Sequence, residues 1–417
     1  MKFRIEHDAL ADVVAWVARA LPSRPVVPVL AGLRLEAGEG LTLSCFDYDL
    51  AATARVAADV AEPGTALVPG RLLAEIIRSL PGQPAEFTAD GDVVSLTCGS
   101  AEFALVSLPL ADYPELPPTP PVAGTIDGGE LAAAVGQVLP AASRDDTLPM
   151  LTAVCLDIRG ESLTLAATDR YRLAVRELQW EPAHPGMRAI ALVPARTLAD
   201  AARTMAPGEL VPVAFTPGDE PAGERDPHPV EGMISFECRG RRLTGRLIGG
   251  EFIRYQSRFP DGYGCRAEIP AVPFIEAVRR VSLVADRASP VRLTFGQDQV
   301  VVEAQTEGRA RAAEAVAASF EGDETTIAFN PHYLLDGLTA AAAGSGPARP
   351  PADQEEGAPA SAAATIRLEF TSPAKPALIT LAGDGGEGPG GEAGEAGAAA
   401  GPPFRYLVVP LRSPTRA

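Results

Sequence analysis

Residues 8–21 read DALADVVAWVARAL, residues 129–142 read GELAAAVGQVLPAA and residues 273–286 read PFIEAVRRVSLVAD. Set in register, the three stretches align apolar residues at spacing i, i+4 and i+7, which is the spacing of the buried stripe of a helix. The aligned sets are Leu10, Leu131 and Phe274; Val14, Val135 and Val278; and Val17, Val138 and Val281. One amphipathic helix is therefore predicted three times, which indicates an internally repeated chain.

The elements that follow these helices recur as well. A proline and a strand-like run come next, at 28–30, 149–151 and 290–292. In the first two copies a β-rich pair follows, and its counterparts Leu41 and Leu163 lie 122 residues apart, as do Asp47 and Asp169. A second helix is predicted near the middle of each copy, at 68–73, 193–198 and 329–334. The remaining runs alternate apolar and polar residues, as half-buried antiparallel strands do.

Pro- and Gly-rich joints at 114–118 and 259–262 separate the copies. We therefore predict an α+β chain of three tandem domains, each an antiparallel sheet with two helices on one face. The predicted boundaries are 1–119, 120–262 and 263–417. Three stretches outside the repeat, 216–232, 343–364 and 383–403, are rich in Gly, Pro, Ala and acidic residues. Such composition buries too little apolar surface to offset chain entropy, so surface loops are expected there, the last two as insertions in the third domain.

Composition narrows the function classes. With 46% hydrophobic and 22% charged residues among 417, the chain is typical of a soluble globular protein. It has neither an apolar run of the roughly 18 residues that span a bilayer nor a secretory signal, so a cytoplasmic protein without membrane contact is expected. Its five cysteines form no CxxC pair and are expected as buried free thiols. The net charge of −18 argues against a protein that coats nucleic acid non-specifically.

The second predicted helices carry a repeated charge register. Its copies are Arg71, Glu75 and Arg78; Arg196, Asp200 and Arg203; and, degraded, His332, Asp336 and Thr339. Residues seven apart share a helix face, here expected opposite Leu72, Ile76 and Leu80. One interpretation is a set of arginines that contact phosphates without reading sequence, extended by Arg279 and Arg280 in the third domain. The other is a solvated face of Arg–acid pairs worth about 0.2–0.5 kcal/mol each. The register leaves both interpretations open.

Motifs of catalysis are missing from the sequence. None of the four histidines has a partner at HxxxH spacing, and no GxxxxGK[ST] loop is present. No GxGxxG motif follows a predicted strand, and the Gly-rich tract at 383–401 is of low complexity, so it is not interpreted as a phosphate-binding loop. No catalytic residue, metal site or cofactor is therefore predicted. An enzyme built on repeated domains remains a third class of function, and it would need a reactive constellation that the sequence does not display.

Several motifs resemble the bacterial sliding clamp, the beta subunit of DNA polymerase III. They are TLPML at 147–151, ATDRYRLAVR at 167–176, GEF at 250–252, PVRL at 290–293, FNP at 329–331, KPAL at 375–378 and YLVVPLR at 406–412. The resemblance implies the DNA-clamp fold, in which two three-domain subunits join head to tail into a closed homodimer ring lined by helices. It implies a non-catalytic processivity factor that encircles double-stranded DNA irrespective of its sequence and tethers the replicative polymerase. The clamp loader and repair proteins are further implied partners.

The resemblance also assigns roles to single residues. Arg24 matches a position that touches DNA. Phe103 and Leu105 match an edge strand that meets the partner subunit's third domain near Leu283. A pocket for the apolar anchors of a partner peptide is implied by Leu151, Thr168, Arg170, Tyr171, Arg172, Leu173, Ile253, Asn330, Tyr333, Leu407, Val408, Val409, Pro410, Leu411 and Arg412. Leucines would line an apolar slot and Arg172 would offer a polar contact. Alternatively, about half of these residues belong to the core at sheet edges.

Departures from the family pattern affect this pocket. Ile253 stands where proline is common, Ser257 replaces a frequent basic residue at the rim, and Val409 takes the place of a frequent methionine. The unusual stretch 383–403 enters just before the last predicted strand. The leading interpretation is a replicative processivity clamp. The alternative is a divergent, actinobacterial-type paralogue with a repair or scaffold role and altered partners.

Overall fold

The computed structural model describes residues 1–216, 229–260, 262–286, 289–306, 308–343, 364–382 and 404–411. The predicted insertions at 343–364 and 383–403 fall almost wholly outside these residues, as do the centre of the 216–232 stretch and Arg412. No helix within the described ranges is long and apolar enough to cross a membrane.

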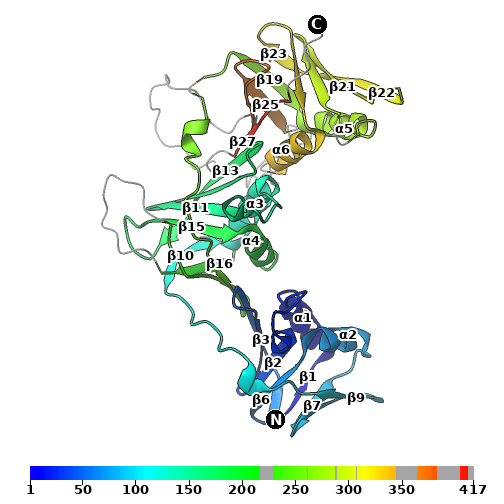
Figure 1. Cartoon of the computed structure of the whole chain (residues 1–417), viewed down its shortest axis with the longest axis vertical. Helices are drawn as coiled ribbons and strands as arrows, with labels where there is room; N and C mark the ends of the chain where they lie inside the picture. The colour runs from blue at the N-terminus through cyan, green and yellow to red at the C-terminus, as the bar shows by residue number, and fades with distance from the viewer. Residues whose placement is uncertain are drawn as a thin grey trace, which may run out of the picture.

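Three α+β units follow one another along a curved chain (Figure 1). The first comprises β1 (Lys2–Ile5), α1 (His7–Ala18), η1 (Pro28–Ala31), β2 (Gly32–Ala37), β3 (Leu41–Phe46), β4 (Leu50–Val56), β5 (Asp59–Glu62), β6 (Gly64–Pro69), α2 (Gly70–Ser79), β7 (Ala85–Asp90), β8 (Val93–Cys98), β9 (Ala101–Val106) and η2 (Leu110–Asp112). The second comprises β10 (Val122–Asp127), α3 (Gly128–Val138), η3 (Leu139–Ala141), η4 (Pro149–Thr152), β11 (Ala153–Arg159), β12 (Ser162–Thr168), β13 (Arg172–Gln179), β14 (Glu181–Pro182), β15 (Arg188–Pro194), α4 (Ala195–Ala202), β16 (Leu210–Phe215), β17 (Met233–Cys238), β18 (Arg241–Arg246) and η5 (Gln256–Arg258). The third comprises β19 (Cys265–Pro270), α5 (Ala271–Ser282), β20 (Val291–Phe295), β21 (Gln299–Thr306), β22 (Ala310–Ala317), β23 (Ser319–Glu321), β24 (Thr325–Phe329), α6 (Pro331–Ala343), β25 (Thr365–Phe370), β26 (Ala377–Leu381) and β27 (Arg405–Val408).

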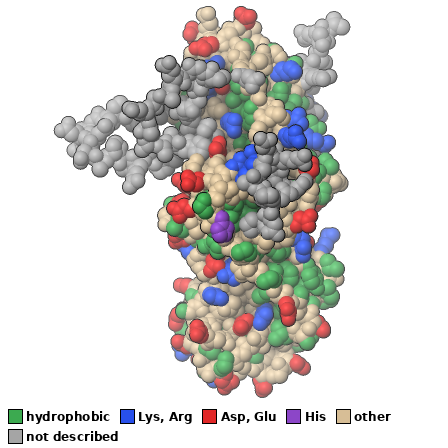
Figure 2. All heavy atoms as spheres, turned by 90° about the vertical axis from the view of Figure 1, so that its left-hand side faces the viewer, with side chains coloured by type: hydrophobic (Ala, Val, Ile, Leu, Met, Phe, Trp, Pro, Cys, Tyr) green, Lys and Arg blue, Asp and Glu red, His purple; other side chains and the backbone are tan. Residues whose placement is uncertain are grey.

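All the labelled helices, α1 to α6, lie on the concave side of this curve, and the sheets form its convex side (Figure 1). The convex face shows acidic and basic side chains interspersed wherever it is not covered by grey atoms (Figure 2). All three domains therefore place their helices on the concave side.

The sheets cross the domain joints. Each domain contributes one five-stranded and one four-stranded half, and at each joint two halves of different domains merge into a nine-stranded antiparallel sheet. The first joint pairs β4 with β18, and the second pairs β13 with β27. A five-stranded sheet ending at β9 and a four-stranded sheet ending at β22 are left at the two ends of the chain. The predicted α+β tandem domains are confirmed, but each domain divides its strands between two sheets instead of forming one.

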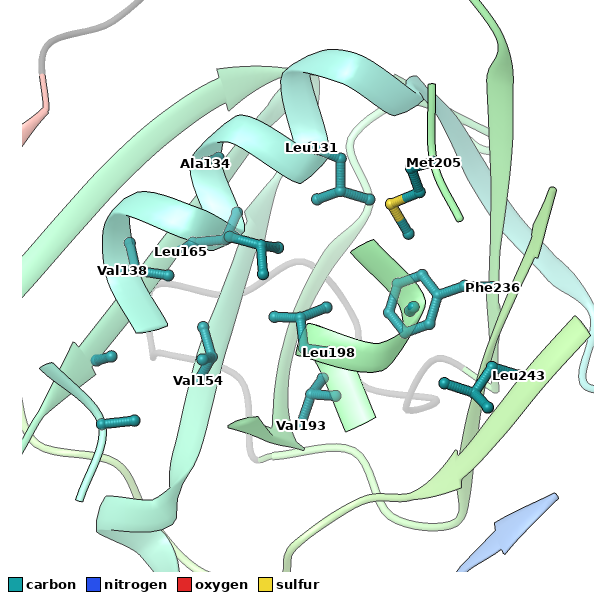
Figure 3. Packing of buried hydrophobic residues seen from close by; sticks show 14 of the residues in the cluster. Leu131, Ala134, Val138, Val154, Leu165, Val193, Leu198, Met205, Phe236 and Leu243 are labelled. Carbon is teal, nitrogen blue, oxygen red and sulfur yellow. The ribbon is translucent and has the colours of Figure 1, made fainter. Parts of the chain in front are cut away.

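The core of each domain lies between its helix pair and its sheets. In the second domain Leu131, Ala134 and Val138 of α3 point towards Val154 and Leu165 of the sheet, and Leu198 of α4 closes the same core (Figure 3). The residues aligned across the three copies are all buried in this way. The apolar stripe that predicted the repeat is therefore the packing face of each helix, where burial of a large side chain stabilises the fold by about 1.5–3 kcal/mol.

The helices end earlier than their apolar patterns do. The first predicted helix ran to residue 21, but α1 ends at Ala18 and the amides of Ala20 and Leu21 bond three residues back, at 3.0 and 3.3 Å. In the second domain α3 stops at Val138, because Pro140 has no N–H to continue the ladder. The chain tightens into 3₁₀ turns in which the last apolar residues still face the core.

Candidate functional site

The turn between β12 and β13 builds one wall of the candidate pocket. Asp169 Oδ1 accepts the backbone N–H groups of Tyr171 and Arg172 at 3.0 and 3.1 Å, while Thr168 Oγ1 donates to the carbonyl of Arg172 at 2.6 Å. Arg170 adopts φ 80° in this turn. A non-glycine residue in this region carries a steric cost, so the side-chain bonds must hold the backbone there. The turn thereby presents residues 168–173 at the end of the sheet.

Arg172 connects the second domain to the third. Its guanidinium donates to Asp169 at 2.9 Å and to Asp336 of α6 at 2.5 Å, and it lies 4.5 Å from the ring centre of Tyr333. Burial opposes the charged form, but contacts with Tyr406, Asp336 and Asp169 outweigh it and raise the pKa of Arg172 above its ordinary value. The polar contact predicted for this residue is thus already made within the chain. Arg172 holds the joint beside the pocket together.

A cavity of about 450 Å³ opens where these two domains meet. Its lining comes from the 168–173 turn, from the connector that follows β18 and from the end of β27. The lining residues are Leu151, Thr168, Arg170, Arg172, Leu173, Ile253, Ser257, Arg258, Pro376, Leu407 and Val409. Leucines and an isoleucine from separate elements face one space, together with three arginines, Arg170, Arg172 and Arg258. Such a slot suits an apolar side chain of a peptide whose backbone or charge is held at the rim.

Some residues expected in the pocket are not among those that line the cavity. Val408 is fully buried in the main core, so its placement in the pocket was wrong: successive side chains of a strand point to opposite faces, and Leu407 takes the pocket side. Pro410 is also buried. Tyr171 and Tyr333 stack outside the lining, with ring centroids 6.1 Å apart. Asn330 accepts the amide of His332 at 2.9 Å and so holds the start of α6. Leu411 is 40% exposed at the described end of the chain, and Arg412 lies outside the described residues.

Two lining residues were not predicted. Pro376 is the second residue of the resemblance motif at 375–378, and its place in that motif was the available signal. Arg258 lies in the short 3₁₀ helix η5, and no spacing in the sequence distinguishes it from other exposed arginines. Ser257, which was expected at the rim, lines the cavity next to Arg258.

The arginines predicted to contact phosphate are all exposed, and apart from Arg24 they lie on or directly after the helices α2, α4 and α5, but they differ in their partners. Within the described part of the chain, Arg24, Arg78, Arg196 and Arg279 form no ion pair. Arg71 donates to the carbonyl of Pro22 at 3.2 Å, which brings it beside the loop that carries Arg24.

The remaining two arginines are paired with acids. Arg203 bonds Asp200 one turn earlier on α4. Arg280 donates to Glu314 at 2.7 Å and to Glu276 at 3.3 Å, and these acids raise its pKa above the ordinary value. The interpretation as Arg–acid pairs therefore describes Arg203 and Arg280, while contact with phosphates stays a prediction for the other arginines. The expected orientation was wrong in one respect: Leu72 is 47% exposed, and α2 buries Leu73, Ile76 and Ile77 in the core.

Each of the four sheets has two edge strands among the described residues. β9 ends the five-stranded half of the first domain as β18 and β27 end those of the other two, and β22 ends the four-stranded half of the third domain as β4 and β13 do, but β9 and β22 are not paired with another half. On β9 Phe103 is half-buried, Val106 is 70% exposed and Leu105 is buried in the first domain's core, so Leu105 offers no surface to a partner in this conformation. Leu283, which follows α5 near β22, is 82% exposed. Long uncovered edges are templates for pairing with another chain, so these two ends are candidate interfaces.

The described residues contain no group of three or more potential metal ligands. All five cysteines are free thiols. Four of them are buried and Cys265 is partly exposed, which agrees with the expectation from their spacing. The pocket, the helix-lined concave side and the free edges are therefore the features on which a function can rest.

Known proteins share this arrangement. Family models of the DNA polymerase III beta subunit match in order: the N-terminal domain at residues 1–117, the central domain at 125–253 and the C-terminal domain at 256–344. The chain is 46% identical over 413 residues to the beta sliding clamp of Streptomyces coelicolor, with 99% of both chains covered. It is 41% identical to that of Micrococcus luteus over 77% of this chain and 100% of the relative. The crystal structure of the Bacillus subtilis sliding clamp superposes with a TM-score of 0.81 at 24% identity over 99% of both chains.

Proposed function

Because this chain belongs to the DNA polymerase III beta subunit family and is a sliding clamp, we propose that two copies close head to tail into a ring around duplex DNA. Sliding clamps are processivity factors, which keep a DNA polymerase on its template. In such a ring the helices of the concave side would face the DNA, and the sheets would form the outer wall. The single observation that carries the proposal is the way in which the sheets end.

The two ends of the chain complement each other in strand number. Each joint inside the chain unites a five-stranded half with a four-stranded half. The free end at β9 belongs to a five-stranded half of the first domain, and the free end at β22 belongs to a four-stranded half of the third. Pairing β9 of one subunit with β22 of another would make the same nine-stranded sheet again. Since the same joint would then occur throughout, a head-to-tail pair would close as a ring of six similar domains.

Side chains at the free edges support the same pairing. Phe103 and Val106 on β9 and Leu283 beside β22 leave apolar surface uncovered in one chain. Covering such surface with a complementary apolar surface is a main contribution to the stability of obligate dimers.

Ring closure accounts for the charge of the protein. A chain of net charge −18 is a poor ligand for DNA in solution. A closed ring stays on DNA because the two are topologically linked, so the arginines of the concave side need only weak contacts with phosphates. Four arginines that form neither an ion pair nor a hydrogen bond with other described residues, Arg24, Arg78, Arg196 and Arg279, are the best placed for this role. Contacts with phosphate carry no sequence information, which allows the ring to slide.

The cavity at the second joint is the proposed docking site for partner peptides. Its apolar lining and arginine rim suit a short motif with apolar anchors, supplied in turn by the replicative polymerase, the clamp loader and repair proteins. We infer that the protein itself catalyses no reaction and works in the cytoplasm, where these partners meet the DNA.

Retention on DNA tests the ring. Purified protein is loaded by its clamp loader onto nicked circular plasmid, separated from free protein by gel filtration and then treated with an enzyme that linearises the plasmid. We expect the protein to remain on circular DNA and to be lost from the linear form. Equal loss from both forms would contradict topological linkage. Retention together with weak binding of the polymerase peptide would instead favour the divergent clamp with altered partners.

Salt dependence separates the two kinds of arginine. Arg279 and Arg280 are neighbours on α5, but only Arg280 is engaged by Glu276 and Glu314. We expect Arg279→Gln to reduce the slope of log affinity for linear duplex against log salt concentration by about 1, because one phosphate contact is lost. Arg280→Gln serves as the matched control and should change the slope little. Equal effects of the two substitutions on the measured slope would show that ion pairing within the chain does not decide which arginine meets DNA.

A further inference from the structure

Two connectors of the chain leave their domains at matching positions in the internal repeat. The amide of Leu108 donates to the carbonyl of Leu67 at 2.7 Å, and the amide of Ile248 donates to that of Leu192 at 2.9 Å. Leu67 and Leu192 each stand directly before the Val-Pro pair that leads into the second helix of a domain. Leu108 and Ile248 are therefore counterparts, and so are the residues that follow them at equal distances.

The residues five positions further along the two connectors differ in size. Tyr113 packs in one buried cluster with Leu67 and Leu108, the two residues that bond at the start of its connector. Ile253 packs against the cluster that holds their two counterparts in the second domain. Tyr113 is 8% exposed, and Ile253 is half-buried. A phenol ring thus takes in the first domain the place that an aliphatic side chain takes in the second.

In the second domain this place is the edge of the peptide cavity. Ile253 lines the cavity together with Leu151 and Thr168. The counterparts of these two residues in the first domain are Leu30 and Phe46. Leu30 and Leu151 are each the third residue of a 3₁₀ helix, and Phe46 and Thr168 are each the last residue of a strand.

Tyr113 contacts both counterparts of the cavity wall. It belongs to the same buried cluster as Leu30. Its hydroxyl accepts the backbone N–H of Phe46 at 2.7 Å and donates to the carbonyl of the same residue at 3.5 Å. Burial raises the pKa of Tyr113 above its ordinary value, so the hydroxyl keeps its proton in the neutral range. The ring therefore fills the space between η1 and the end of β3.

The turn beside each of the two places is built in the same way. Asp47 accepts the amide of Leu50 at 2.8 Å, and Asp169 accepts that of Arg172 at 3.1 Å. The residue after each aspartate has a positive φ, of 75° in the first domain and 80° in the second. The backbone thus forms the same slot in both domains, and the side chain from the connector distinguishes them.

We propose that the side chain at this connector position decides whether a slot can take a peptide: Tyr113 plugs the slot of the first domain, and Ile253 leaves that of the second open. A plug that belongs to the same chain loses no translational freedom on binding, so it has an advantage over a free peptide. Each subunit would then offer one peptide site, although the repeat supplies the slot twice. This inference rests on the proposed peptide pocket.

Ile253→Tyr in the full-length protein tests whether a plug closes the second slot. The readout is the Kd of a fluorescein-labelled short peptide that carries the clamp-binding motif of the replicative polymerase. We expect the Kd to rise at least about tenfold, since apparent affinity falls in proportion to the fraction of open pocket. Phe252→Tyr is the matched control: Phe252 is half-buried and does not line the cavity, so this variant should bind as the unchanged protein does. An unchanged Kd for Ile253→Tyr would overturn the inference.

Tyr113→Ile tests the reverse change in the first domain. Removal of the ring leaves an apolar slot beside Leu30 and Leu67, and titration calorimetry should find two peptides per subunit instead of one. The new site should be the weaker one, because Tyr48 and Pro118 stand where the second slot has its rim arginines. Tyr113→Phe keeps the ring and should still bind one peptide. A single site in Tyr113→Ile would contradict the proposed plug.

Crystal structures of the variants without peptide separate the plug from the pocket. The new ring of Ile253→Tyr is expected against Leu151, and Tyr113→Ile is expected to show a cavity beside Leu30. A ring turned out into solvent in the first variant, or a collapsed slot in the second, would overturn the inference. Failure of the unchanged protein to bind the peptide would count against the proposed pocket, while these two structures would still decide whether a tyrosine fills the slot.

Discussion

A chain with Leu283→Asp is expected to be a monomer at concentrations where the unchanged protein is a dimer. Leu283 is 82% exposed and follows α5, whose Arg280 bonds Glu314 on the free strand β22. Association of β9 with β22 would enclose the new carboxylate in an apolar interface, where an unpaired charge is strongly unfavourable. We expect the dimer Kd to rise at least about 100-fold, as is typical when a central interface residue is disrupted. Sedimentation velocity over a dilution series measures the change.

Folding of the monomer should not be affected by this substitution, because the side chain is already in solvent. Val272→Asp is the matched control: Val272 is 61% exposed at the other end of the same helix. It should leave both the dimer and the retention on circular plasmid intact. If Leu283→Asp remained a dimer, the proposed pairing of the two free edges would be incorrect, whatever the behaviour of the protein on DNA.

Leu151→Asp is expected to abolish measurable binding of the polymerase peptide, with a loss of at least about 100-fold. Leu151 lines the cavity together with Leu173 and Leu407, and an apolar anchor of the peptide would have to desolvate the new carboxylate. A penalty of about 2.8 kcal/mol is enough for a factor of 100 in Kd, and burial of an unpaired carboxylate costs at least that much. Fluorescence anisotropy with the labelled peptide measures the change.

The neighbouring Met150 provides the control for the pocket. It is 39% exposed and does not line the cavity, so Met150→Asp should bind the peptide normally. Both variants should remain dimers and should be retained on circular plasmid, because the pocket lies away from both free edges. Equal loss of binding in the two variants would show that the peptide contacts this part of the surface without entering the slot.

Arg172 has a different role in the structure from the one that its motif predicted. The motif favoured a polar contact between Arg172 and a partner peptide. In the fold its guanidinium is shared between Asp169 and Asp336 and covered by Tyr333, so it joins two domains at the edge of the pocket. The arginines at the rim that remain for a partner are Arg170 and Arg258. Only the second of these was absent from the sequence-based prediction.

The amino-acid sequence by itself determined the repeat, the helices and the family. The apolar stripes that align Leu10, Leu131 and Phe274 are local patterns with helical spacing, and burial of such a stripe is what the fold requires of each copy. Resemblance of short motifs was enough to bring together most residues of the cavity, since these motifs lie in the turns and strand ends that build it.

Only the tertiary structure decided which face of a strand a side chain occupies at a domain joint. It also decided which group each charged or polar side chain bonds. Val408 and Leu407 are equally apolar, and only the register of β27 against β13 sends one into the core and the other into the pocket. Tyr113 and Tyr255 are both buried tyrosines in connectors that leave a domain, yet the hydroxyl of Tyr113 accepts the amide of Phe46 at the end of β3, whereas the hydroxyl of Tyr255 donates to Asp157 on β11. These outcomes depend on contacts between residues about 70 to 160 positions apart in the chain, and no local spacing records such contacts because folding, not sequence order, brings the groups within reach.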